Sequence, residues 1–198
     1  MELKAVDREY IKSGLVLAAV DLLKAHGLQG LKISMIEQKA GYSATTFYEY
    51  FNHANEILPF CVRQIELECS QSVSGQIHRA SKWVNKVKAI VKAYIHYLLQ
   101  YPNLFNALFW EKSTPFDHQL ETSVWAISFL DRLCADEWEF CLNKKQFTGR
   151  QILRLRQEIR YVAIGMLSLY INRNHPQTRR EFDKAVKEQL ERILAKDH

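Results

Sequence analysis

The stretch Gly-Tyr-Ser-Ala-Thr-Thr-Phe-Tyr-Glu-Tyr-Phe at residues 41–51 decides the fold of this chain. Gly41 permits a tight turn between two short helical segments. The Ser43 hydroxyl can cap the start of the second segment. Phe47 and Phe51 lie four residues apart, so they share one face of that helix and can anchor it to a core. The stretch therefore predicts a helix-turn-helix whose second helix covers about residues 43–50.

The exposed end of this second helix carries small or hydrogen-bonding side chains. Ser43 and Thr46 can bind phosphates or base edges, and Thr45 can offer its methyl group to a thymine. Tyr48 can bind a phosphate through its hydroxyl. These groups favour DNA as a partner. The alternative is a helical hairpin whose Thr and Tyr side chains simply face solvent.

The rest of the chain predicts an all-α protein. Apolar residues recur at helical spacing over 8–25 and 31–40, and no segment alternates in polarity as a strand does. Further helices are expected at residues 55–74, 77–100, 102–112, 117–144, 150–173 and 178–195. Pro59 must lie in the first turn of the fourth helix or bend that helix. We expect two domains, at residues 1–54 and 55–198.

Composition narrows the class of protein. The 198 residues are 47% hydrophobic, yet no apolar run approaches the roughly 20 residues of a membrane span. The first residues lack the apolar core of a signal peptide, so we expect a soluble, cytoplasmic protein. The net charge of +5 is uneven, because residues 1–60 carry −1 and residues 149–198 carry +5. Global charge therefore does not support DNA binding, and only local placement of basic groups could.

No pattern of catalytic or cofactor-binding residues stands out. The 4 cysteines form no C-x-x-C pair, and the 7 histidines are scattered without an H-E-x-x-H motif. We find no glycine-rich phosphate loop and no assignable nucleophile with its base. The sequence therefore predicts no metal, no cofactor and no enzymatic activity, and the cysteines are expected to be packed, reduced thiols.

These residues together resemble the TetR family of one-component regulators. The match lies within residues 18–58 and includes Ala18-Ala19, Gly27, Ile36, Ala40-Gly41, Ser43, Thr46, Tyr48, Tyr50-Phe51 and Ile57-Leu58. The chain departs from the family pattern at three places: Leu31-Lys32 replaces the usual Thr before the second helix, Thr45 replaces a small residue, and Ala54 replaces a phosphate-binding Lys. The resemblance implies a homodimer with an N-terminal DNA reader and a C-terminal ligand pocket. The expected DNA contacts are Lys32, Tyr42, Ser43, Ala44, Thr45, Thr46, Tyr48 and His53, with Lys39 and Lys12 as further phosphate candidates.

Aromatic residues gather in the middle of the chain, where residues 94–140 hold 11 of the 23. Aromatic walls suit a mainly apolar ligand pocket, although aromatic residues at helical spacing also form ordinary core. The expected lining is Trp83, Tyr94, Phe105, Phe109, Trp125, Phe129 and Met166. The ligand would be a small apolar or aromatic effector.

The last two predicted helices are candidates for dimerisation. Residues 161–171 lack any charge, and a helix that is apolar on every side must be buried on every side. Two such helices per chain can form a four-helix interface across a two-fold axis, although plain intrachain packing is the alternative. The expected interface is Ile159, Val162, Met166, Leu169, Phe182, Val186 and Leu190. A dimer would bind a roughly palindromic operator. We favour a repressor that its ligand releases from DNA; the alternative is a ligand-binding protein of the same fold that does not bind DNA.

Overall fold

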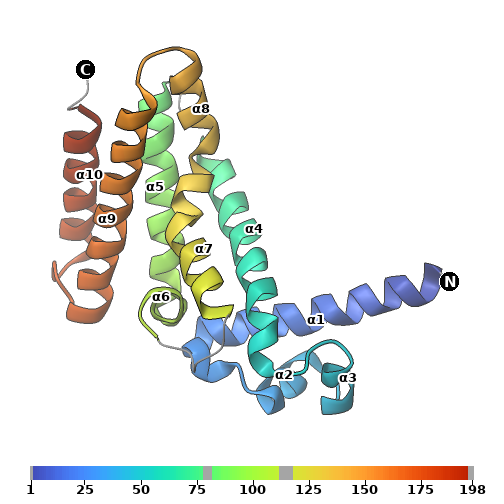
Figure 1. The fold of residues 1–198 in the computed structure, drawn as a ribbon. Coiled ribbons are helices and arrows are strands. Elements are labelled where there is room, and N and C mark those ends of the chain that lie inside the picture. Colours follow the sequence, from blue (N-terminus) through green and yellow to red (C-terminus); the bar gives the residue numbers. More distant parts are fainter. Residues whose placement is uncertain (1, 78–81, 112–117, 196–198) are drawn as a thin grey trace. The chain divides into compact units, whose positions relative to one another are not determined.

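The computed structural model describes residues 2–77, 82–111 and 118–195, and side chains over 7–75, 82–111 and 126–195 (Figure 1). Most of the described residues are helical, and no strand occurs among them. The prediction of an all-α protein is therefore confirmed. No described helix is long and apolar enough to cross a membrane.

Ten α-helices follow one another along the described chain, with two short 3-10 turns between them. They are α1 Glu2–His26, α2 Ile33–Ala40, α3 Ala44–Tyr48, α4 Leu58–Ile77, α5 Trp83–Gln100, α6 Pro102–Phe109, α7 His118–Leu133, α8 Ala135–Asn143, α9 Gly149–Arg173 and α10 Arg179–Ala195, with η1 at Gly27–Gly30 and η2 at Ala54–Ile57. Pro59 lies in the first turn of α4, where its missing N–H costs no hydrogen bond.

One predicted helix is wrong in the structure. The segment 117–144 was expected to be continuous, but α7 ends at Leu133 and α8 begins at Ala135. Cys134 between them has φ −99° and ψ 12°, which leaves the α-helical range. No Gly or Pro occurs in this segment, so the sequence carries no local signal for the break.

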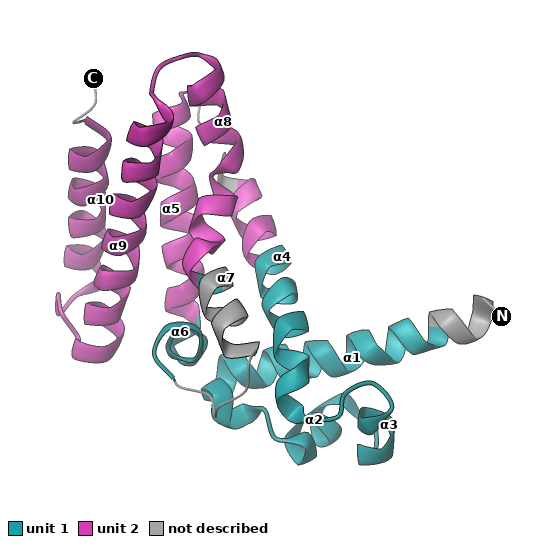
Figure 2. Ribbon diagram, in the orientation of Figure 1, with its two compact units in different colours: residues 1–68, 101–126 teal, residues 69–100, 127–198 magenta. Residues whose placement is uncertain are grey.

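The first compact unit comprises residues 1–68 and 101–126 (Figure 2). Its core is formed where α1 packs against α2 and α6. Two hydrogen bonds tie distant segments of the unit together: the Asn103 amide donates to the Ala25 carbonyl at 2.6 Å, and the Leu28 amide donates to Glu111 at 2.9 Å. The short helices α2 and α3 thus rest on a scaffold that includes residues far along the chain.

The second unit comprises residues 69–100 and 127–198. Its core is formed where α9 packs against α5 and α10. The buried stripe of α9 consists of Ile152, Leu155, Ile159, Ala163 and Leu167, and that of α10 includes Phe182, Val186, Leu190 and Ile193. Both stripes follow the helical repeat, so each helix buries one face. These units are divisions of packing, and the functional division expected at residue 54 stays a prediction.

Candidate nucleic-acid interface and effector unit

The turn between α2 and α3 is built by two residues. Gly41 ends α2 in the left-handed conformation, with φ 74°, and its amide donates to the Glu37 carbonyl. Glycine adopts this conformation without a steric penalty. Ser43 then caps α3, because its hydroxyl accepts a hydrogen bond from the Thr46 amide at 3.2 Å. The predicted turn chemistry is therefore present at both positions.

A buried aromatic face holds α3 in place. Phe47 is fully buried, and its ring lies 5.4 Å from that of Phe51, which is also buried. Ile36 on α2 is likewise fully buried. A helix of five residues has little stability of its own, so this packing rather than helix propensity fixes its position.

The opposite face of the helix-turn-helix is open. Ser43 and Thr45 are exposed, and the side chain of Tyr48 is 55% exposed. Ala44 and Thr46 are half-buried, with the Thr46 hydroxyl 3.0 Å from that of Ser43. The structure thus brings these five expected DNA contacts together on α3 and its cap.

Tyr42 is half-buried and differs from this group. A Cβ atom added at Gly14 would lie 3.1 Å from the Tyr42 ring, so the ring packs directly against α1. Tyr42 therefore braces the turn through contact with α1, whatever part its hydroxyl takes in binding.

The expected phosphate-binding residues have different surroundings. Lys32 is exposed at the start of α2, and His53 is exposed ahead of η2. Lys39 forms an ion pair with Asp21 at 3.1 Å. The Lys12 ammonium lies 4.0 Å from the centre of the Phe60 ring, so its charge already makes a cation–π interaction.

Sequence reasoning missed one basic residue near the reader. The Arg8 guanidinium lies 5.9 Å from the centre of the Tyr50 ring, just past the end of α3. Arg8 is exposed. No sequence signal could have found it, because it precedes the helix-turn-helix by some thirty residues and reaches it only through tertiary packing.

The expected effector-binding aromatics fall into separate pairs. Tyr94 and Phe129 are buried in the second unit, with ring centres 5.7 Å apart. Trp83 packs edge-on against Phe147 at 5.3 Å in the same unit. Phe105 and Phe109 pair at 5.1 Å in the first unit. Met166 is half-buried on α9, and the side chain of Trp125 lies outside the described residues.

A buried polar cluster in the second unit was not anticipated. The carboxylate of Asp131 forms ion pairs with Arg156 at 3.3 Å and with Arg160 at 3.2 Å. The Nε atoms of both arginines are buried without a hydrogen-bond partner in the described structure. Burial raises the pKa of Tyr94 well above its ordinary value, and Cys69 and Asp131 add to the shift. Two guanidinium groups thus share one carboxylate close to an aromatic core, and their Nε–H groups are left without an acceptor.

The cysteines are free thiols. All four are buried. Burial raises the pKa of Cys61 to about 12 and that of Cys141 to about 11, so both stay protonated near neutral pH. Within the described ranges, no three His, Cys, Asp or Glu side chains converge as metal ligands would.

The expected dimer residues divide between core and surface. Ile159, Phe182, Val186 and Leu190 are buried within the protomer, and Val162 and Met166 are half-buried. Leu169 is 50% exposed, and Tyr161 is 67% exposed on the same helix. The surface available on α9 is therefore centred on residues 161–169.

Comparison with known proteins supports this architecture. Residues 15–58 match the family model described as bacterial regulatory proteins, tetR family. No curated protein sequence matches the chain. A putative tetR family transcription regulator from Shewanella sp. PV-4 has a similar structure, with a TM-score of 0.65 and 12% identity over 91% of this chain and 95% of that one.

Two further solved structures share the fold. The fatty acid degradation regulator FadR from Bacillus halodurans gives a TM-score of 0.69 and 16% identity over 93% of this chain and 98% of that chain. A putative fatty acid metabolism regulator from Clostridium perfringens has a TM-score of 0.60 and 19% identity over 92% of this chain and 97% of that chain. The chain shares its fold with these regulators, and residues 15–58 match the tetR family model. The resemblance inferred from the sequence is therefore confirmed.

Proposed function

We propose that the protein is a sequence-specific DNA-binding transcriptional regulator, a repressor that a small, mainly apolar or aromatic ligand releases from its operator. The observation that carries this proposal is the capped helix-turn-helix, in which buried Phe47 fixes α3 while the hydroxyls of Ser43, Thr45 and Tyr48 remain accessible. Helix N-termini with exposed hydroxyls suit phosphates and base edges. Such a regulator would act in the cytoplasm, with residues 1–54 as reader and 55–198 as effector and dimerisation domain.

Two chains would act together on the DNA. The exposed apolar surface of α9, with Tyr161 and Leu169, supports a two-fold interface in which the same patch meets itself. Val162 and Met166 flank this surface. A two-fold dimer presents two α3 helices to successive major grooves, so its operator would be a palindrome with half-sites about one helical turn apart.

The effector would act through α4. This helix contributes residues 58–68 to the first unit, which contains the reader, and residues 69–77 to the second unit. A ligand that binds one arrangement of α4 more tightly than another shifts the population of DNA-competent dimers. The buried pair Tyr94 and Phe129 supports an apolar ligand. Two proteins of similar structure are named as regulators of fatty acid metabolism or degradation, which supports the same class.

The test is selection of bound sequences from a random DNA pool at near-physiological salt, followed by affinity measurements on Tyr48→Phe and Tyr48→Ala. We expect an enriched palindrome, partial loss of affinity in the phenylalanine variant and larger loss in the alanine variant. Trp110→Ala is the matched control, because Trp110 is also 55% exposed in the first unit but lies outside the helix-turn-helix. Equal operator affinity of Tyr48→Ala and the wild type would remove Tyr48 from the interface.

The second candidate is a ligand-binding protein of the same fold that does not bind DNA. Ala54 and the net charge of −1 over residues 1–60 favour it. A folded dimer that enriches no sequence, with and without candidate ligands, would support this second function. Tight operator binding with a steep dependence on salt would exclude it.

A further inference from the structure

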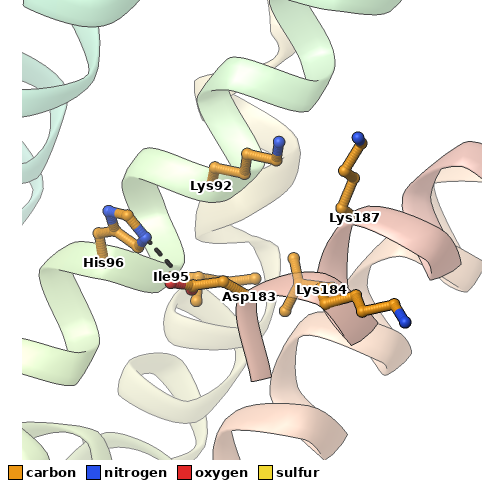
Figure 3. A pocket seen from close by; sticks show the side chains of 7 residues that line it. Lys92, Ile95, His96, Asp183, Lys184 and Lys187 are labelled. Atoms are coloured by element: carbon orange, nitrogen blue, oxygen red, sulfur yellow. Dashed lines mark ion pairs between the residues drawn. The ribbon is translucent and has the colours of Figure 1, made fainter. Parts of the chain in front are cut away.

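A surface groove runs between α5 and α10 within the second unit (Figure 3). Its volume is about 390 Å³, which falls in the range of small-molecule sites. The residues that line it are Lys92, Ile95, His96, Asp183, Lys184, Val186 and Lys187. All of them belong to one compact unit, so the groove is complete within that unit.

The floor of this groove is apolar. Ile95 and Val186 are both buried, and they come from the two facing helices. Lysine side chains add to the apolar walls, because their four-carbon stems cover apolar surface while the ammonium reaches solvent. A short aliphatic chain laid along this floor would be removed from water.

The rim of the groove is basic. Helix α5 carries three lysines and no carboxylate. In Figure 3 the side chains of Lys92 and Lys187 extend from facing helices toward the same end of the groove, while Lys184 points away from them. Within the described part of the chain, no carboxylate lies within ion-pair distance of Lys92. Lys184 and Lys187 meet Glu188 and Glu191 only at 3.8 and 4.0 Å, in exposed pairs of little strength.

The one acidic group of the lining is already engaged. Both oxygens of Asp183 accept hydrogen bonds from the Arg179 Nε at 3.0 Å. The same carboxylate lies 3.6 Å from His96 Nε2. Arg179 therefore offsets the charge of Asp183, and the lysine ammoniums remain for an incoming anion.

From this arrangement we infer that the groove binds a small amphiphilic anion, with a carboxylate or phosphate head between Lys92 and Lys187 and an aliphatic chain over Ile95 and Val186. An ammonium is a point charge that accepts either head group without a preferred geometry. The apolar floor would bind the aliphatic chain of the ligand, and the two lysine ammonium groups would bind its anionic head group. This site is separate from the aromatic effector site proposed above, and it does not depend on DNA binding.

The test is calorimetric titration of the full-length protein, without DNA, using octanoate and octyl phosphate as probes. Octanol, which has the aliphatic chain without the charge, and inorganic phosphate, which has the charge without the chain, are the control ligands. We expect saturable binding of one amphiphile per chain, and at least roughly tenfold weaker binding of each control ligand. If only one of the two amphiphiles binds, that result identifies the head group.

Substitutions locate the site. Lys92→Met and Lys187→Met keep the aliphatic stem and remove the charge, so each should weaken binding roughly fivefold. Lys144→Met, an exposed lysine of the same unit outside the groove, is the matched control and should bind as the wild type does. A photoreactive derivative of the carboxylate should label peptides from α5 and α10.

Three results would overturn the inference: no binding of either amphiphile, binding of octanol as tight as that of octanoate, or equal affinity in all three lysine variants. Labelling confined to other helices would equally assign the ligand elsewhere. A change in sedimentation caused by Lys92→Met alone would assign the groove to a second copy of the chain. None of these results bears on operator binding, which is measured separately.

Discussion

A glutamate at position 169 tests the proposed dimer most directly. Leu169 is 50% exposed on α9, one helical turn beyond Gly165 and two beyond Tyr161. A Cβ added at Gly165 would meet nothing within 4 Å, so the space around the centre of this face is open. In the proposed dimer, the two copies of Leu169 are buried by the symmetric interface.

The size of the effect follows from the exposed fraction. Burying a whole leucine side chain contributes about 1.5–3 kcal/mol, so the exposed half contributes about 1 kcal/mol per chain and about 2 kcal/mol per dimer. Two unpaired glutamates at an apolar contact add a desolvation cost of a few kcal/mol. We therefore expect Leu169→Glu to weaken dimerisation by at least about 4 kcal/mol, or roughly a thousandfold in the dissociation constant.

Sedimentation velocity over a wide range of protein concentration measures this constant. Leu142→Glu is the matched control, because Leu142 is 44% exposed on α8 of the same unit and lies outside α9. Both variants should retain the helical circular dichroism of the wild type. If Leu169→Glu sediments as the wild type does at every concentration, the dimer face is not on this part of α9.

Three further predictions concern the interior. Phe47→Ala should lower the unfolding free energy by about 3–5 kcal/mol in urea titrations, because a fully buried phenylalanine leaves a cavity. Asp131→Asn should lower the unfolding free energy by about 2 kcal/mol. This loss is smaller than that for breaking a fully buried ion pair, since the arginine partners of Asp131 are 38% and 17% exposed. The control is Asp136→Asn, which changes an exposed residue and should alter the unfolding free energy little. The pKa of about 12 for Cys61 and about 11 for Cys141 predicts that a thiol reagent at pH 7 modifies neither until guanidinium unfolds the chain, so modification of the native protein would contradict their burial.

The local chemistry of the helix-turn-helix could be predicted because it depends on neighbours in sequence. Gly41 adopts the left-handed conformation and Ser43 caps α3 as their positions required. The spacing of Phe47 and Phe51 gave the buried face directly. In each case the interacting atoms belong to residues no more than four positions apart, so the sequence pattern contains the relevant information.

The remaining features depend on contacts that the sequence pattern does not contain. The break at Cys134 has no Gly or Pro to mark it. The cluster of Asp131 with two arginines joins residues at least 25 positions apart, and Arg8 reaches Tyr50 through packing alone. Patterns of polarity also could not separate Phe182, which is buried in its own protomer, from Leu169, which is half-exposed, because both sit on apolar stripes.

The low charge of the reader has a consequence for how the proposed regulator would work. Residues 1–60 carry a net charge of −1, and three of their lysines already have partners: Lys24 and Lys39 form ion pairs, and Lys12 lies over an aromatic ring. Each phosphate neutralised adds about 0.9 to the salt slope of binding, so one reader with few free cations gains little affinity from the DNA backbone. Two linked readers gain much more, because the second binds at a high effective concentration. Loss of the α9 interface should therefore abolish operator binding even though α9 lies outside the helix-turn-helix. Leu169→Glu should neither dimerise nor bind the operator, whereas Leu142→Glu should do both.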